Sequence, residues 1–233
     1  MLDVKALDAW YGQAQILYGV NLAVGAGECV ALVGRNGAGK STTMKAVMGL
    51  IAKKRGRIAF RGRDISALPA YRIGRLGLGW VPEDRRIFTD LTVRENLAVA
   101  RQPPRDGAPE WTPDKLYALF PNLGAMPDRP GGRMSGGEQQ MLTVARTLMG
   151  NPYLVLLDEP SEGVAPIIVE EMARMIVALK AAGVAILLSE QNLHFARLVS
   201  DRAVVLEKGE VKFEGTMEAL MSDEALLRTH LSV

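Results

Sequence analysis

The sequence predicts an α/β fold built on a mainly parallel β-sheet. Three short and largely apolar runs carry this prediction: Glu28–Val33, Tyr153–Leu157 and Val184–Ser189. Parallel sheets bury both faces of their strands, so such strands are continuously apolar rather than alternating. Segments with helical spacing separate the runs, which is typical of parallel strands joined by helices. The 233 residues suffice for one such core with an insertion.

The first half of the predicted core surrounds a glycine-rich loop. The strand Glu28–Val33 leads into that loop, and a helix over Lys40–Met48 follows and ends at Gly49. Arg57–Phe60 is predicted to be a strand followed by a turn, and Leu78–Pro82 a further short strand. The order strand, loop, helix places the loop at the carboxyl end of a strand.

The second half of the core holds two buried strands and a hairpin. Tyr153–Leu157 and Val184–Ser189 flank a helix predicted over Pro166–Ala182. Ala203–Glu207 and Glu210–Phe213, joined by a Lys-Gly turn, have the pattern of a β-hairpin. The apolar face of the predicted helix consists of Ile168, Met172, Met175, Ile176 and Leu179.

The middle of the chain differs because it holds no convincing strand. Helical patterns over Val93–Arg101 and Pro113–Phe120 are separated by stretches rich in proline and glycine. The sequence therefore predicts an all-helical lobe, residues 89–150, inserted into an α/β core formed by residues 1–88 and 151–233.

Composition and charge limit the classes of function. A net charge of +2 gives no strong field for nucleic acid, so we expect no nucleic-acid partner. The single cysteine, Cys29, excludes an internal disulfide, and its apolar neighbours favour a buried structural thiol over a reactive one. No apolar stretch approaches the roughly 20 residues that span a bilayer, and the N-terminus lacks a signal-peptide pattern. We therefore expect a cytoplasmic protein that reaches a membrane only through a partner.

The segment from Gly34 to Ser41 has the spacing of a phosphate-binding loop, G-x-x-x-x-G-K-[ST], between a predicted strand and a predicted helix. Its glycines let the backbone turn, so that N–H groups and the helix N-terminus hold the β- and γ-phosphates. Lys40 adds a positive charge, and the Ser41 hydroxyl is a ligand for Mg²⁺. By chance, such a turn is expected in about one chain in a hundred of this length. The predicted nucleotide-binding residues are Gly34, Asn36, Gly37, Ala38, Gly39, Lys40, Ser41 and Thr42.

Two carboxylates, Asp158 and Glu159, directly follow the apolar strand Tyr153–Leu157. In a doubly wound sheet, the carboxyl end of such a strand lies beside the phosphate loop. Asp158 is predicted to hold Mg²⁺ through water, and Glu159 to orient or deprotonate the attacking water. The alternative is an acidic pair that only ends a strand. The phosphate loop, which we expect beside it, favours the catalytic role.

A third motif, Ser135-Gly136-Gly137-Glu138, has the spacing of a helix capping box. These residues could simply begin a helix, with Ser135 as the N-cap and Glu138 at the third position. Capping does not require the two glycines, however, and glycine lowers helix stability. The glycines instead favour close approach of the backbone to a negative group at the positive end of the helix.

The three motifs, in this order, resemble those of the nucleotide-binding subunit of an ATP-binding cassette (ABC) transporter, and the resemblance covers essentially the whole chain. It implies a P-loop NTPase core with an N-terminal antiparallel β portion, and hydrolysis of ATP with Mg²⁺. It also implies that two such subunits pair head to tail. The signature residues Ser135, Gly136 and Gly137 would then contact the γ-phosphate of ATP held by the other subunit.

Further positions match the family and imply roles. Tyr11 lies where the family places an aromatic residue that stacks on adenine; a core or surface aromatic on an early strand is the alternative. Trp10 would point to the opposite face of that strand. Two positions depart from the family pattern, with Glu83 where a glutamine is usual and Gln191 where a histidine is usual. Ala165 stands where an aspartate is common.

The two departures bear on catalysis at this subunit's own site. Gln191 can donate a hydrogen bond to a γ-phosphate oxygen but cannot become cationic. Glu83 can face Mg²⁺ but adds negative charge beside the phosphates. We therefore expect both to join Lys40 and Glu159 in the catalytic set, and we keep a nucleotide-gated pairing subunit with weak hydrolysis as the alternative.

The departures also resemble one subgroup, the ATPase subunits of bacterial importers for branched-chain and other hydrophobic amino acids. Thr92–Leu97 and Leu119–Pro121 fit the same subgroup. The resemblance implies a second ABC ATPase as partner, usually a homologous and non-identical one, with a homodimer as the alternative. It further implies integral-membrane permease subunits and, indirectly, a periplasmic substrate-binding protein. Importers for urea, short amides or aromatic acids remain alternatives, because the cargo never touches this chain.

Two further expectations follow from the family. The helical lobe and the loop that carries Glu83 would form a groove for a permease segment, with Ile87 and Phe88 as exposed apolar candidates. The rival class is a non-transport ABC ATPase that acts on chromosomes, DNA repair or ribosomes. Such proteins usually carry long coiled coils, zinc insertions or two cassettes, and the sequence has none of these patterns.

Overall fold

A computed structural model describes residues 1–231 of the chain. Its strands are β1 (Leu2–Tyr11), β2 (Ala14–Val24), β3 (Cys29–Val33), β4 (Lys53–Phe60), β5 (Arg63–Asp64), β6 (Leu78–Val81), β7 (Leu154–Asp158), β8 (Ala185–Glu190), β9 (Arg202–Glu207) and β10 (Glu210–Thr216). Its helices and short helical turns are α1 (Lys40–Val47), α2 (Ala70–Arg75), α3 (Val93–Ala100), α4 (Pro113–Leu119), α5 (Pro121–Gly124), η1 (Gly131–Arg133), α6 (Gly136–Leu148), α7 (Pro166–Ala181), α8 (Leu193–Val199), α9 (Met217–Ser222), α10 (Glu224–Leu226) and η2 (Leu227–Leu231).

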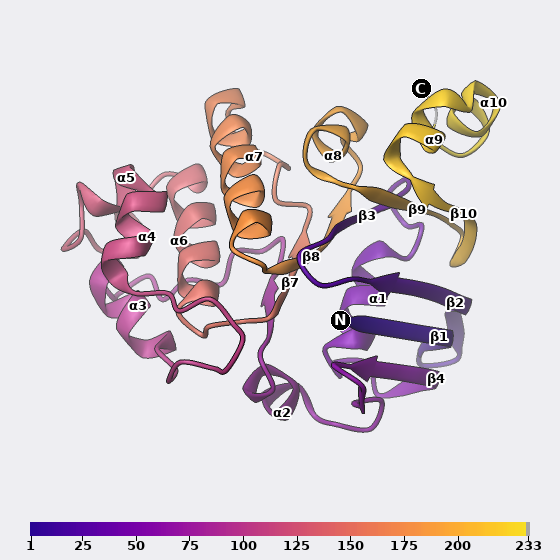
Figure 1. Ribbon diagram of the computed structural model, residues 1–233, viewed down its shortest axis with the longest axis horizontal. Coiled ribbons are helices and arrows are strands. Elements are labelled where there is room, and N and C mark those ends of the chain that lie inside the picture. Colours follow the sequence, from indigo (N-terminus) through magenta and orange to yellow (C-terminus); the bar gives the residue numbers. More distant parts are fainter. Residues whose placement is uncertain (232–233) are drawn as a thin grey trace.

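The larger sheet has six strands in the order β10-β9-β3-β8-β7-β6 (Figure 1). The pairs from β9 to β6 are parallel, and β10 runs antiparallel to β9. The parallel order places the carboxyl ends of β3, β7 and β8 at the same edge of the sheet. The predicted α/β class with a mainly parallel sheet is confirmed.

The central strands are apolar because helices or a second sheet cover both of their faces. Every residue of β3, β7 and β8 is buried. The observed ends differ slightly from the predicted ones. Glu28 precedes β3, whereas Asp158 and Glu190 belong to β7 and β8, because they pair with Ser189 and Val33 on the neighbouring strands.

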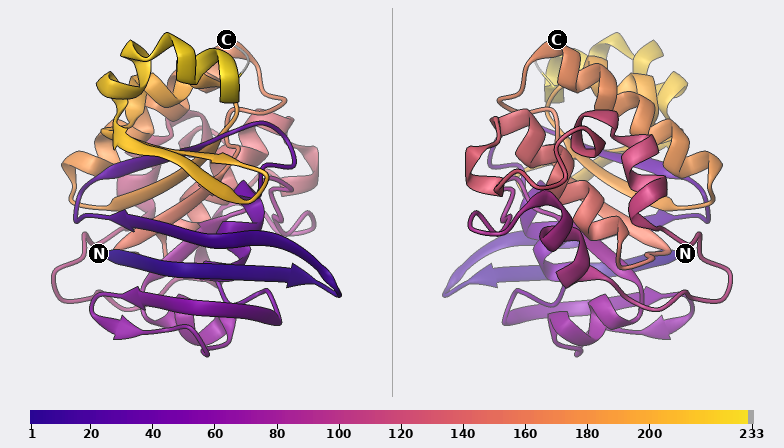
Figure 2. Two further views of the ribbon diagram at one scale, coloured as in Figure 1. Left: turned by 90° about the vertical axis from the view of Figure 1, so that its right-hand side faces the viewer. Right: turned by 90° about the vertical axis from the view of Figure 1, so that its left-hand side faces the viewer.

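A second sheet, in the order β2-β1-β4-β5, is antiparallel and forms the expected N-terminal β portion. Figure 2 shows this sheet facing the viewer on one side of the molecule. Helix α1 lies between the two sheets, since Met44 and Val47 share one core cluster with Leu7 of β1 and Leu32 of β3. This packing fixes the start of α1, and therefore the loop that precedes it.

Helices α3 to α6 stand together beside the parallel sheet (Figure 1). Met141 of α6 shares a core cluster with Leu157 of β7. The buried amide of Asn96 binds the segment that precedes α3. Its Oδ1 accepts a hydrogen bond from the backbone N–H of Phe88 at 3.0 Å. Its Nδ2 donates to the carbonyl oxygens of Phe88, Leu91 and Thr92. The division into residues 89–150 and the rest stays a prediction.

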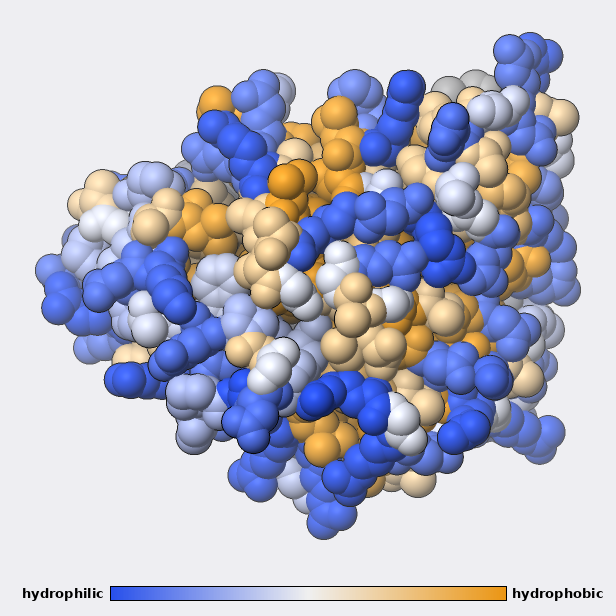
Figure 3. Space-filling view, in the orientation of Figure 1, coloured by the Kyte–Doolittle hydropathy of each residue, from blue (hydrophilic) through white to orange (hydrophobic). Residues whose placement is uncertain are grey.

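The surface is polar over most of the face seen in Figure 3, with apolar residues gathered near its middle. Cys29 is buried, as its neighbours predicted, and burial raises the pKa of its thiol to about 12. No helix within residues 1–231 is both long enough and apolar enough to cross a membrane.

Candidate functional site

The glycine-rich loop connects β3 to α1 in a backbone form that needs its glycines. Gly37 and Gly39 have φ values of 80° and 109°, in the left-handed region that residues with a side chain rarely adopt. A Cβ on Gly39 would also lie 2.8 Å from the Cδ2 of Leu17. The Thr43 hydroxyl donates to the Gly39 carbonyl oxygen at 3.0 Å, which ties the loop to the first turn of the helix.

Lys40 forms a buried ion pair at the base of this loop. Its Nζ lies 3.0 Å from Oε1 of Glu159, and the two side chains are 3% and 8% exposed. The same ammonium donates to the carbonyl oxygens of Gly34 at 2.7 Å and Arg35 at 3.3 Å. Glu159 therefore supplies the negative charge that the buried ammonium of Lys40 requires.

Ser41 and Asp158 meet next to this pair. The Ser41 hydroxyl donates to Oδ1 of Asp158 at 3.0 Å. Burial raises the pKa of the Asp158 carboxyl, and the hydrogen bond from Ser41 offsets part of that rise. Within residues 1–231 there is no group of three or more His, Cys, Asp or Glu side chains able to hold a metal. A hydroxyl and a carboxylate side by side fit Mg²⁺, which takes one or two protein oxygens and completes its shell with phosphate and water.

A cleft of about 430 Å³ opens over the loop. It brings together residues that are far apart in the sequence, and several of them are predicted site residues. Tyr11, at the end of β1, is 49% exposed and lines this cleft. Trp10 does not line it; its ring lies under Lys53 and Arg55 on the other side of the strand. The lining consists of Tyr11, Ile16, Asn36, Gly37, Gly39, Lys40, Ser41, Thr42, Glu83, Glu159 and Glu162.

Three glutamates line the cleft together with Lys40. Glu159 sits directly after β7 with φ of 47°, a left-handed conformation that a glutamate rarely adopts. Glu162 follows three residues later on the same loop, and its hydrogen bond with Glu159, together with repulsion between the two, raises the pKa of Glu162 to about 7. Glu83 is exposed at the rim. A carboxylate in such a cleft is suited to orienting water.

Gln191 lies outside the residues that line the cleft. It directly follows β8 and is exposed. Its buried neighbour Glu190 connects two loops, since its carboxylate accepts from the backbone N–H groups of Ser161 at 3.1 Å and Asn192 at 3.2 Å. Burial raises the pKa of Glu190, and these hydrogen bonds offset part of the rise. The loop after β7 and the segment that carries Gln191 are thereby joined.

The predicted capping box is present at the start of α6. Ser135 and Glu138 exchange the two expected hydrogen bonds, with the Ser135 N–H donating to Glu138 at 2.6 Å. The structure adds a packing reason for both glycines within the chain itself. A Cβ on Gly136 would lie 2.6 Å from Nη1 of Arg85, and one on Gly137 would lie 2.7 Å from Cγ1 of Ile168. These residues are not part of the cleft over the phosphate loop.

Three side chains near these features were not predicted as site residues. Ile16 and Glu162 line the cleft, and Arg85 covers the first turn of α6. Glu162 carried a signal, because it follows the carboxylate pair by three positions and is charged. Ile16 and Arg85 carried none, because their positions depend on contacts between distant segments.

Comparisons with known proteins agree with the family that the motifs resemble. A family model described as ABC transporter matches residues 17–162. The chain is 40% identical, over 99% of both chains, to the high-affinity branched-chain amino acid transport ATP-binding protein BraG of Pseudomonas aeruginosa. It is 35% identical to the lipopolysaccharide export system ATP-binding protein LptB of Haemophilus influenzae, over 99% of this chain and 97% of that one.

Among solved structures, a nucleotide-free ATP-binding cassette from an ABC transporter superposes with a TM-score of 0.83 at 25% identity. The match covers 100% of this chain and 98% of that chain. The two relatives and this solved structure each match 99% or more of the chain. The chain therefore belongs to the ABC transporter family and is an ATP-binding and ATP-hydrolysing subunit of such a transporter.

Proposed function

We propose that this chain powers an importer of branched-chain or other hydrophobic amino acids. The observation that carries the proposal is the 40% identity, over nearly the whole of both chains, to a branched-chain amino acid transport protein. The second candidate is lipopolysaccharide export, which the relative at 35% identity favours. The two candidates share the ATPase chemistry and differ in the permease that the chain would drive.

In this proposal, ATP lies in the cleft between Tyr11 and the phosphate loop. Tyr11 stacks on the adenine ring, and the N–H groups of the loop hold the phosphates. Lys40 exchanges the carboxylate of Glu159 for phosphate oxygens. Ser41 and Asp158 would hold Mg²⁺, which neutralises phosphate charge when it is bound. The remaining loop residues proposed above contribute backbone donors.

Release from Lys40 gives Glu159 its catalytic role. The freed carboxylate orients the attacking water and accepts its proton. Gln191 donates a hydrogen bond toward the γ-phosphate but brings no positive charge. Glu83 at the rim adds a negative charge on the same side. Catalysis by this site is therefore mainly positioning, and its positive charge comes from few groups.

We further propose that the site is completed by a second ABC ATPase, a homologue or a second copy. Ser135, Gly136 and Gly137 begin α6, and they are absent from the cleft of their own chain. The positive N-terminus of α6 is suited to bind the γ-phosphate of ATP held by the partner. Closure around ATP would then move the lobe of residues 89–150 against the core.

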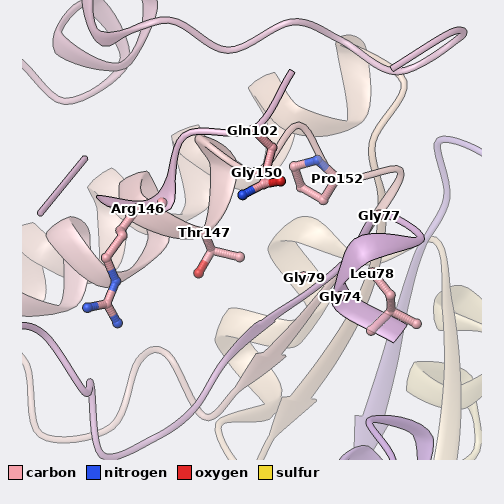
Figure 4. A pocket seen from close by; sticks show the side chains of 10 residues that line it. Gly74, Gly77, Leu78, Gly79, Gln102, Arg146, Thr147, Gly150 and Pro152 are labelled. Atoms are coloured by element: carbon pink, nitrogen blue, oxygen red, sulfur yellow. The ribbon is translucent and has the colours of Figure 1, made fainter. Parts of the chain in front are cut away.

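A smaller cleft between the lobe and the core is the proposed docking site for the permease. Its volume is about 260 Å³, and α2, β6 and the end of α6 line it. Figure 4 shows the side chains of Gln102, Arg146 and Thr147 around it. Phe88, on the nearby loop, is 49% exposed, as expected, whereas Ile87 is half-buried against the lobe. Docking here would place the chain on the inner face of the plasma membrane.

Copurification tests the proposal and separates its two candidates. The tagged chain is recovered from its native membrane in mild detergent, and the associated proteins are identified. We expect two permease subunits, and we expect ATPase activity of the reconstituted complex to rise with an amino-acid-loaded periplasmic binding protein. Recovery of lipopolysaccharide-export components, with no response to amino acids, would replace the import proposal with the second candidate.

A further inference from the structure

Side chains of α6 form hydrogen bonds with the backbone of the loop between β6 and α3. The Thr143 hydroxyl donates to the carbonyl oxygen of Arg85 at 2.5 Å, and the Arg146 guanidinium donates to that of Arg86. Arg85 and Arg86 have φ values of 62° and 44°, so two consecutive residues with side chains adopt the left-handed conformation. Such strain persists only where surrounding contacts impose it. These contacts hold the backbone of Arg85 against α6.

The guanidinium of Arg85 lies at the first turn of α6. A Cβ on Gly136 would lie 2.6 Å from Nη1, 3.3 Å from Cζ and 3.5 Å from Nη2 of Arg85. The guanidinium thus lies directly against the glycine backbone. Among residues 1–231, Arg85 takes part in no ion pair, whereas the next residue, Arg86, pairs with Asp84 at 2.8 Å. Arg85 presents an uncompensated positive charge beside the N-terminus of a 13-residue helix.

The cleft of one chain offers little positive charge for the γ-phosphate. Glu83 adds a carboxylate to the cleft, and Gln191 cannot become cationic. Lys40 is the one cation among the residues that line the cleft within the described chain. Developing charge on a transferred phosphoryl group is commonly stabilised by arginine. A cation from the opposite subunit would therefore supply what this cleft does not.

We propose that Arg85 is a trans-acting γ-phosphate ligand: from beside Gly136, its guanidinium binds the terminal phosphate of ATP held by the partner subunit. The inference rests on the head-to-tail pairing proposed above. It assigns the arginine a charge-dependent role in ATP-driven pairing. A purely structural arginine at this place would instead act through its packing on Gly136 and would be indifferent to the nucleotide.

The test uses Glu159→Gln, in which we expect ATP-bound pairs to accumulate because the variant lacks the proposed catalytic carboxylate. Pair formation with Mg²⁺ and increasing ATP is followed by sedimentation, with the chain alone and with its copurified ATPase partner. Arg85→Gln removes the charge but retains much of the side chain, and Arg85→Lys retains the charge. We expect Arg85→Gln to raise the ATP concentration for half-maximal pairing by about 10- to 100-fold, and Arg85→Lys to restore most of the loss.

The matched control is Arg86→Gln, which removes a guanidinium from the same loop and should leave pairing unchanged. Binding of ADP to the isolated chain should also be unchanged in Arg85→Gln, because the arginine does not act on its own cleft. Equal pairing by Arg85→Gln and Arg86→Gln would overturn the role of Arg85. Equal loss in Arg85→Gln and Arg85→Lys would also overturn it, in favour of packing. If Glu159→Gln itself never pairs with ATP, the proposed head-to-tail site fails as well.

Discussion

The ion pair between Lys40 and Glu159 predicts that these two residues are energetically coupled in the empty chain. Lys40→Met leaves the Glu159 carboxylate, 8% exposed, without its cation. Removing one partner of a buried pair costs about 3 kcal/mol, because the other charge stays buried and uncompensated. Glu159→Gln costs less, about 2 kcal/mol, since the ammonium keeps the carbonyl oxygens of Gly34 and Arg35.

The double variant leaves neither charge uncompensated. We therefore expect it to lose about 3 kcal/mol rather than the sum of about 5, which is a coupling of about 2 kcal/mol between the two side chains. For a chain of this size, 1 kcal/mol shifts the unfolding midpoint by about 2–4 °C. Lys40→Met should accordingly melt about 6–12 °C lower, and adding Glu159→Gln should lower the midpoint no further.

The assay is reversible urea unfolding of the nucleotide-free chain, with thermal melting as a second measurement. All four members of the cycle are compared at the same pH and salt. Strictly additive losses would refute the reasoning, because they would show that the two side chains do not interact in the empty site.

Three further predictions concern single positions. Tyr11→Ala should weaken binding of both ATP and ADP by about 5- to 100-fold, as expected for loss of one base–aromatic stack, while Tyr11→Phe should bind normally; fluorescence titration measures both. Cys29 should resist alkylation in the native chain at pH 9, because burial raises the pKa of its thiol to about 12, and it should react rapidly in urea. The unfolded thiol ionises near its ordinary pKa of 9.0, so this residue should make stability fall as the pH rises from 9 toward 12, which Cys29→Ala should prevent. Gln191→His should leave ATP turnover intact or raise it, since it adds a potential cation; complete loss of turnover would show that the glutamine has a function of its own.

The parts of the fold that the sequence predicted are those dictated by burial. β3 is apolar throughout, β7 and β8 are apolar up to their last one or two residues, and short buried runs of this kind are typical of parallel strands. The first two strands, β1 and β2, are less evident from the sequence. They pair with several register shifts, and Ala6 has a left-handed backbone, so their side chains do not alternate regularly. The antiparallel portion was expected from resemblance alone.

In the candidate site, too, some features follow from the local sequence and others depend on tertiary contacts. The phosphate loop and the carboxylates after β7 follow from local spacing, because strand and helix geometry place them. The contact of Lys40 with Glu159 does not follow from local spacing, since it depends on an unusual backbone conformation at the glutamate. The position of Arg85 against Gly136 joins segments about 50 residues apart and depends on the hydrogen bond from Thr143. Contacts of this kind are set by tertiary packing, which local patterns do not encode.

The central claim is that the phosphate loop of one subunit and the signature of the other share each ATP. Vanadate photocleavage tests it most directly, because vanadate occupies the γ-phosphate position and cuts the backbone beside it under light. The measurement uses pairs made of one Lys40→Ala subunit and one unmodified subunit, whether a copy of this chain or its copurified homologue. The account predicts cleavage at Ser135 of the Lys40→Ala subunit and none at the signature of the unmodified one. Cleavage at the signature of the unmodified subunit, with Ser135 of the Lys40→Ala subunit uncut, would contradict it.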